Sequence, residues 1–255
     1  MVFRRSGPVF GIPVVILVLL LLDGGCDAAL SGDFIFRSLI HRFHPDAIEL
    51  VLDAEPDETG AVRRLYAALT GAVYEGIRID SLSLEAVFCV FRTVRDSGGT
   101  ELAELASSVN GYFDARLRER DLNDFLVGRV VDGNGDEKWK KVRVDFLPSR
   151  LSARGYYSNS GLTALVELDG MLELVDGTQV ILSDYALRIN NADQASFVEA
   201  AIRKAQPLLD FRKFPFPVVL KSLVITDDSI SLATRVPPKR FKGIVFRYGK
   251  SGRQP

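Results

Sequence analysis

The sequence predicts an α+β protein in which long antiparallel sheets of consecutive strands carry a few packed helices. Two observations predict this class. Most of the chain after residue 76 consists of extended runs rich in Val, Ile, Leu, Tyr and Phe, separated by turns that contain Gly, Asn or Asp. A smaller number of segments place apolar residues three and four positions apart, which is the spacing of an amphipathic helix. Because no internal repeat or long linker interrupts them, we expect a single domain over residues 29–236.

Residues 1–28 have the order of segments that is typical of an export signal. Arg4 and Arg5 precede the apolar stretch Val9–Leu22, and the small residues of Gly24–Ala29 follow at once. Fourteen helical residues rise about 21 Å, which is short of the roughly 30 Å hydrocarbon core of a bilayer. A cleaved signal peptide, a lipoprotein signal acylated on Cys26 and an uncleaved anchor all fit this pattern. Each of them predicts a location in the periplasm or cell envelope.

Helices and strands are expected to alternate in the first half of the chain. Phe34–Phe43 has apolar residues at helical spacing and is stopped by Pro45, and Ala61–Val73 shows the same spacing. Further helices are expected over Thr100–Val109, Arg120–Val127 and, in the second half, Ala195–Gln206. The strands expected between them cover Ala47–Ala54, a run that starts at Ile77, and Tyr112–Leu117.

The second half is expected to be a succession of strands. Asp169-Gly170 and Asp176-Gly177 are both strong hairpin signals, so a turn is expected at each. The expected strands are Lys140–Leu147, Leu151–Tyr157, Leu162–Leu168, Met171–Leu174, Gln179–Ile189, one that ends at Thr226, and Ile230–Thr234.

The overall charge hides an asymmetry along the chain. The 255 residues contain 32 Lys and Arg against 33 Asp and Glu, and this balance argues against a nucleic-acid partner. Residues 29–236 hold 24 basic and 31 acidic side chains, whereas residues 237–255 hold six basic ones and no acid. The sequence therefore predicts an acidic body with a basic tail.

Each sequence pattern that could indicate a metal site is incomplete. His41 and His44 could form half of a zinc site, but the chain has no third histidine. Asp132–Asp136 resembles the start of a calcium loop, yet Glu137 stands where such a loop has glycine. Arg143 occupies the position of the distal acidic ligand. We therefore expect solvated histidines, a surface loop and no metal.

The patterns for catalysis are equally weak. His41 and Asp46 have the His-x-x-x-x-Asp spacing of some acyltransferases, but no phosphate-binding motif follows them. Cys89 lies in an apolar run and is expected to be a buried small hydrophobe. No Gly-rich phosphate loop or nucleophile elbow is present. The sequence thus favours a protein with no catalytic residue and no cofactor.

Apolar strand surface is the remaining feature, and two interpretations of it stay open. Many of the expected strands are apolar on one face and polar on the other, as in an ordinary filled core. A curved sheet that wraps around a ligand cavity would have the same pattern.

One long stretch resembles a known family. Phe197–Leu232 contains Gln206-Pro-Leu-Leu-Asp-Phe211 and Phe214-Pro-Phe-Pro217, followed by a strand, an Asp-rich turn and a last strand. This order resembles the C-terminal signature of the LmeA-like phospholipid-binding proteins. Leu117–Leu126 is similar to the family's central helix start, and Leu69–Ile77 to one of its strand entries. The resemblance covers residues 34–235.

The resemblance implies an exported envelope protein with an elongated, tubular lipid-binding-like fold around an apolar groove. Its ligand would be a lipid, in the first place a phospholipid. An acyl chain gains about 0.8 kcal/mol per buried CH₂, so such a groove needs no sharp polar motif. The alternative is a structural envelope protein with a filled core. The groove residues implied by the resemblance are Val198, Ile202, Leu209, Phe214, Phe216, Leu220 and Leu223.

Two interpretations of the tail over residues 237–255 also stay open. Aromatic and aliphatic residues interleave with its cations, so the tail could lie on an anionic membrane surface or dock a partner. Otherwise it would be a disordered, solubilising segment. The candidate membrane-surface residues are Lys239, Arg240, Lys242, Arg247 and Lys250.

Overall fold

The strands of this protein form two antiparallel sheets that lie end to end. The structure is a computed structural model, and it describes residues 30–74, 76–127, 130–132, 138–159, 161–190, 199–200, 202–203, 206–213 and 217–250. Residues 1–28, with the expected export signal, and the loop residues 133–136 lie outside the described residues. No helix among the described residues is long and apolar enough to cross a membrane.

The first sheet has eight strands, in the order β12-β13-β5-β3-β2-β1-β14, and β4 also pairs with β3. Its strands are β1 (Ala47–Leu52), β2 (Ala61–Tyr74), β3 (Ile77–Arg95), β4 (Glu101–Ser107), β5 (Asn110–Arg118), β12 (Leu220–Ile225), β13 (Ser229–Thr234) and β14 (Ile244–Gly249). The second sheet has six strands in the order β11-β10-β9-β8-β7-β6. Its strands are β6 (Val130–Asp132), β7 (Lys138–Leu147), β8 (Arg150–Asn159), β9 (Leu162–Val175), β10 (Gln179–Ile189) and β11 (Leu209–Asp210).

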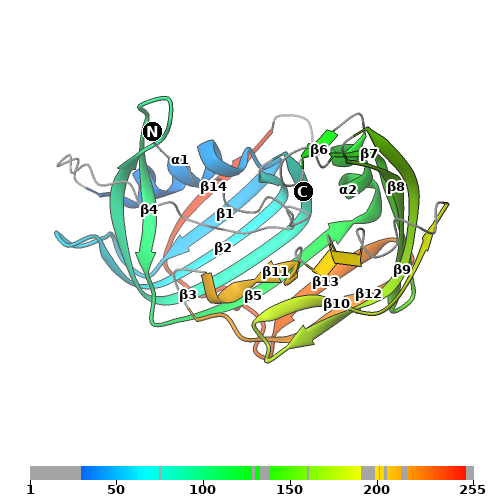
Figure 1. Cartoon of the computed structure of the whole chain (residues 1–255). Helices are drawn as coiled ribbons and strands as arrows, with labels where there is room; N and C mark the ends of the chain where they lie inside the picture. Colours follow the sequence, from blue (N-terminus) through cyan, green and yellow to red (C-terminus); the bar gives the residue numbers. More distant parts are fainter. Residues whose placement is uncertain are drawn as a thin grey trace, which may run out of the picture.

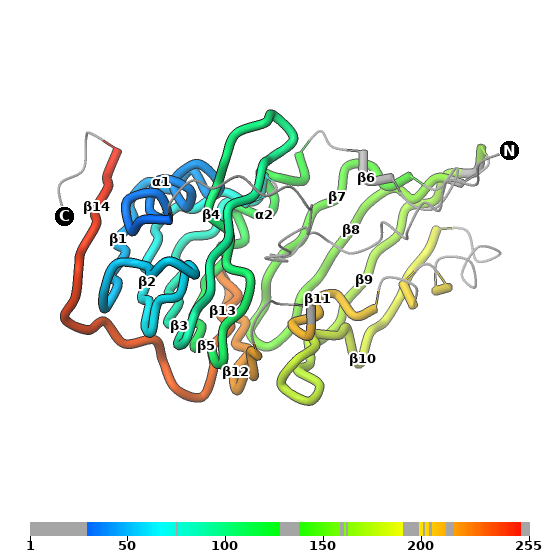
Figure 2. The backbone as a smooth tube through the Cα atoms, turned by 90° about the vertical axis from the view of Figure 1, so that its left-hand side faces the viewer, coloured from blue at the N-terminus to red at the C-terminus, as the bar shows by residue number. Residues whose placement is uncertain are grey.

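Both sheets curl, and one helix lies against each (Figure 1). α1 (Gly32–Phe43) lies in the concave side of the first sheet, and α2 (Glu119–Leu126) packs on β7 of the second. The view in Figure 2 shows the two sheets side by side along an elongated molecule. Of the two clusters of buried apolar side chains, one contains residues of α1 and most of the first sheet, and the other residues of α2 and most of the second. Each also takes in residues of the other sheet, such as Val180 in the first cluster and Leu117 in the second. The expected α+β fold with long, curved antiparallel sheets is therefore confirmed.

Local signals in the sequence set the ends of α1. The Ser31 hydroxyl accepts a hydrogen bond from the Phe34 N–H at 3.1 Å and so caps the first turn. At the other end, His44 takes a left-handed conformation and its N–H donates to the Ile40 carbonyl, directly before Pro45. The helix expected over Phe34–Phe43 is thus confirmed, with one more half-turn at its start.

Two of the expected helices are strands in the structure. Ala61–Val73 lies in β2, between β1 and β3, and Thr100–Val109 contains β4. Gly71, in the middle of β2, has a φ of +61°, which a right-handed helix cannot contain. In β2 the alternate residues Leu65, Ala67 and Leu69 are buried, as in a strand with one covered face. The helical spacing was misleading because it also counted Tyr66 and Val73, which are only partly buried.

The two hairpin signals have different outcomes. Asp176-Gly177 does form the turn between β9 and β10, as expected. Asp169-Gly170 instead lies inside the continuous strand β9, so the turn expected there is wrong. A Cβ on Gly170 would approach the Leu182 side chain to 2.8 Å. This glycine therefore permits close packing against β10 rather than a change of chain direction.

The segment expected to be a basic tail includes a strand of the first sheet. β14 pairs with β1 along its whole length, from Ala47 opposite Gly249 to Leu52 opposite Ile244. Residues 235–243, here called the strap, connect β13 on one side of the sheet to β14 on the other (Figure 2). The Lys239 N–H donates to Glu85 at 2.8 Å, and Phe241 lies under the Arg64 guanidinium. The interpretation of residues 237–250 as a disordered tail is wrong, because backbone pairing and these contacts order them.

Candidate functional site

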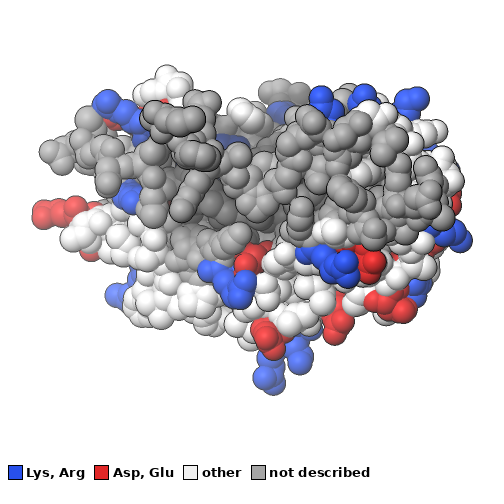
Figure 3. All heavy atoms as spheres, viewed as in Figure 1, with Lys and Arg blue, Asp and Glu red and all other residues white. Residues whose placement is uncertain are grey.

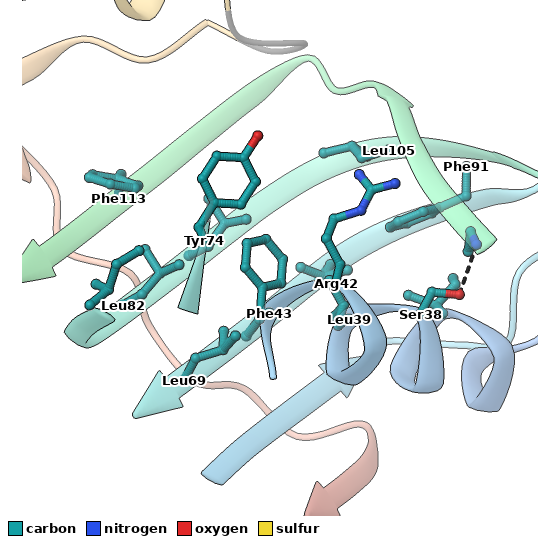
Figure 4. A pocket seen from close by; sticks show the side chains of 16 residues that line it. Ser38, Leu39, Arg42, Phe43, Leu69, Tyr74, Leu82, Phe91, Leu105 and Phe113 are labelled. Carbon is teal, nitrogen blue, oxygen red and sulfur yellow. Dashed lines mark hydrogen bonds between the residues drawn. The ribbon is translucent and has the colours of Figure 1, made fainter. Parts of the chain in front are cut away.

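An apolar hollow lies between α1 and the concave face of the first sheet. The space inside it amounts to about 940 Å³, a figure that includes the part open to solvent. Figure 4 shows side chains from α1, β2, β3, β4 and β5 directed into it. We call it the first hollow. Its lining residues are Ile35, Ser38, Leu39, Arg42, Phe43, Leu65, Ala67, Leu69, Tyr74, Ile79, Leu82, Leu84, Phe91, Ala103, Leu105 and Phe113.

A polar contact fixes α1 over this hollow. The Ser38 hydroxyl donates to the Phe34 carbonyl at 2.7 Å and accepts a hydrogen bond from the Ala103 N–H of β4 at 2.8 Å (Figure 4). Both groups are inside the protein, where losing such a bond is costly. This contact holds α1 on β4. At the C-terminal end of the helix, the Phe43 ring packs near that of Tyr74 of β2, with ring centroids 5.9 Å apart. The helix therefore forms a fixed wall of the hollow.

A second hollow lies next to the first. The space inside it amounts to about 590 Å³, open solvent included, and Ile79 and Phe113 line both hollows. The ring of Phe113 meets that of Phe211 edge to face, with centroids 5.9 Å apart. The remaining lining residues are Ala115, Arg116, Leu117, Leu172, Val180, Leu208, Leu209, Leu223, Ile230 and Leu232. The two hollows are thus neighbours, and we refer to them together as the groove.

A comparison with protein-family models identifies the group to which the chain belongs. The model described as LmeA-like phospholipid-binding matches residues 58–235, which is more than half of the chain. The chain belongs to the LmeA-like phospholipid-binding family. Comparison with curated proteins and with solved structures gave no significant match. The matched residues include β2 to β13 but neither α1 nor β14, so one wall of the first hollow lies outside the region that defines the LmeA-like match.

The groove residues implied by the family signature lie in several places. Leu209 and Leu223 line the second hollow, and Leu220 is buried in the core under the first sheet. Ile202 belongs to the other core cluster, beside α2 and the second sheet. Val198, Phe214 and Phe216 lie outside the described residues.

The residues that line the first hollow were missed as groove candidates. Ile35, Leu39 and Phe43 do share the apolar face of the helix expected in that region. That spacing predicts a buried face, but it does not indicate whether the space opposite is filled. The hollow could be recognised only once β2 was placed as a strand beneath the helix.

Three of the five candidate membrane-surface residues pair with acids of the first sheet. Arg240 and Arg247 both donate to Glu49, and Lys250 contacts Asp46 at 3.1 Å. The hydrogen bonds from Arg240, and after them those from Arg247, lower the pKa of Glu49 despite its partial burial. Hydrogen bonds from Lys250 and Arg78 likewise lower the pKa of Asp46. Much of the positive charge of the strap and β14 is therefore balanced locally.

The other two candidates, Lys239 and Lys242, are exposed and form no ion pair with any residue in the described part of the chain. The face seen in Figure 3 likewise shows positive and negative side chains interspersed over the described surface. Of the strap and β14, these two lysines and the equally exposed Arg235, which forms no ion pair with a described residue, are thus the positive charges most available to an outside surface.

The titratable groups singled out in the sequence have ordinary surroundings. His41 contacts Asp96 at 3.2 Å on the surface, and the His41 and His44 rings are 6.1 Å apart. Among the described residues, no group of three or more His, Cys, Asp or Glu side chains could hold a metal ion. Burial raises the pKa of Cys89 to about 12, so its thiol stays protonated at neutral pH. Cys89 is thus the small buried residue that its apolar surroundings predicted.

Proposed function

We propose that this protein is exported to the cell envelope and there binds or shuttles phospholipid in the groove, without catalysing a reaction. The observation that carries the proposal is a pair of neighbouring apolar hollows in a chain that matches a phospholipid-binding family. Each methylene that enters such a groove from water contributes about 0.8 kcal/mol. One long acyl chain would therefore bind firmly through contact with the lining side chains alone. Export is supported by the basic, apolar and small segments of residues 1–28.

The test is to look for lipid in the purified protein. The full chain is expressed with its N-terminal segment, purified from the envelope fraction without harsh detergent, and measured by native mass spectrometry. We expect a mass increment equal to one phospholipid, and saturable uptake of a phospholipid with a fluorescent acyl chain from vesicles. The mass of the mature N-terminus is read from the same sample. Protein that carries no lipid and takes up none would contradict the proposal and favour a structural envelope protein.

We also propose that the strap lies on an anionic membrane surface when lipid is exchanged. Lys239 and Lys242 support this, because they are exposed and lack a partner among the described residues, whereas Arg240, Arg247 and Lys250 pair with acids. Each lysine near an anionic surface contributes about 1 kcal/mol.

Replacing both lysines by glutamine is expected to weaken binding to phosphatidylglycerol vesicles about 30-fold at low salt. The measurement is vesicle co-sedimentation over a range of ionic strength. Lys138 and Lys140 are exposed lysines of β7 in the second sheet, and their double glutamine variant is the matched control. Equal binding by both variants and the unmodified protein would reject the membrane role of the strap.

A further inference from the structure

Arg42 is the only charged residue among the described residues that line the first hollow. It belongs to the last turn of α1, and in Figure 4 its guanidinium extends away from the helix, on the same side as the Tyr74 hydroxyl. The other lining residues are apolar apart from the Tyr74 hydroxyl and Ser38, whose hydroxyl is engaged with β4. The hollow therefore has an apolar interior and one positively charged position.

Arg42 also differs from the basic residues beside it on the helix. Arg37 pairs with Asp33 at 2.8 Å, and His41 contacts Asp96. Arg42 is partly buried and has neither an ion pair nor a hydrogen bond to a side chain in the described part of the protein. A guanidinium beside apolar walls is costly unless water or an anion satisfies its five N–H donors.

The chemistry of the guanidinium indicates which anion would fit. Its planar fork matches two oxygens of a phosphate at once, and charge-assisted bonds of this kind are stronger than neutral ones. A lipid phosphate could reach Arg42 from the open side while its acyl chains extend past Phe113 into the second hollow. Arg42 also lies in the last turn of α1, where the helix dipole favours a cation. The experiment must therefore distinguish phosphate binding by Arg42 from stabilisation of the helix.

We propose that Arg42 binds the phosphate group of the lipid and so sets its orientation in the groove. This inference rests on the proposed function, because it assumes that acyl chains occupy the two hollows. It adds a residue outside positions 58–235, the part of the chain that matches the family. It also predicts that the protein binds a lipid with a phosphate in preference to the same lipid without one.

The test compares phosphatidic acid with diacylglycerol, both carrying the same fluorescent acyl chain. The full-length protein is titrated with each lipid, as are Arg42→Gln, Arg42→Lys and the matched control Arg37→Gln. Arg37→Gln removes a charge from the same helix at an exposed position. We expect Arg42→Gln to lose about tenfold in affinity for phosphatidic acid and to keep its affinity for diacylglycerol. Arg42→Lys should lose less, and Arg37→Gln should bind both lipids like the unmodified protein.

Several outcomes would overturn the assignment. An equal loss of affinity for both lipids in Arg42→Gln would mean that Arg42 stabilises the helix and does not bind the phosphate. A lower thermal unfolding temperature of the same variant would then accompany this loss. An unmodified protein that binds both lipids equally would leave the proposed function standing and refute the role of Arg42. Failure to bind either lipid would instead refute the proposed function. Displacement of phosphatidic acid by inorganic phosphate alone would show a free-phosphate site rather than a lipid headgroup site.

Discussion

Replacing Leu84 by tryptophan is expected to abolish phospholipid uptake while the protein stays folded. Leu84 lies on β3 between Ala67 of β2 and Phe113 of β5, is partly buried, and lines the first hollow. A larger ring at this position would extend into empty space and take the place of several methylenes of an acyl chain. Excluding three methylenes costs about 2.4 kcal/mol. We therefore expect a loss of about 50-fold or more in affinity.

The measurement is the same fluorescent uptake titration, with thermal unfolding as the check on folding. Val224→Trp is the matched control, because Val224 is a β12 residue whose side chain is 51% exposed and lines neither hollow. Normal uptake by Leu84→Trp, with an unchanged unfolding temperature, would mean that lipid binds somewhere other than the groove.

Removing residues 244–255 is expected to destabilise the whole protein by about 3–5 kcal/mol and to cause aggregation. β14 is the outer partner of β1, whose Leu50, Val51 and Leu52 are fully buried. Phe246 stacks on Phe36 of α1, with ring centroids 5.6 Å apart. Deleting the strand removes this aromatic contact and leaves the backbone of β1 as an open edge, a template for pairing with other chains.

Urea unfolding followed by circular dichroism measures the stability, and size-exclusion chromatography measures the association. If the truncated chain cannot be purified, Phe246→Ala tests the same contact and should cost about 2 kcal/mol. Val245→Thr is its control, because Val245 is half-exposed and points to the other face of the strand. A monomeric truncated protein with an unchanged midpoint would contradict the structural role of β14.

The pairing of β14 with β1 also limits how the membrane role of the strap can be tested. Deleting the basic tail would remove a strand of the sheet, so weaker vesicle binding by such a protein could follow from unfolding. The substitutions at Lys239 and Lys242 avoid this difficulty, because both side chains are exposed on the strap.

Part of the candidate site could be predicted from the sequence. The family resemblance led to Leu209 and Leu223, which do line the second hollow, and the apolar spacing of Phe34–Phe43 identified the helix that covers the first. Arg42 could not be singled out, because one arginine near the end of a helix is unremarkable until its neighbours are known. Whether a cation is paired depends on residues such as Asp33 and Asp96, of which Asp96 is far away in the chain.

The largest errors in the fold have a common physical cause. Ala61–Val73 has helical spacing, yet it is a strand because β1 and β3 pair with both of its edges. The local pattern cannot report those backbone hydrogen bonds, which come from residues up to 29 positions away. The strand β14, which no sequence pattern predicted, is the most extreme example of such a distant partner, since β1 lies almost 200 residues earlier.

By itself, the sequence determined the fold class, the C-terminal end of α1, most strands of the second sheet and the family. These properties depend on short-range periodicity, capping and turn residues, or on motifs that are contiguous in the chain. Only the tertiary structure decided that the space beneath α1 is hollow, that Arg42 stands in it without a protein anion among the described residues, and that the basic end is a strand. Each of these depends on contacts between distant segments, and whether such a contact fills a space or leaves it open depends on the curvature of the sheet.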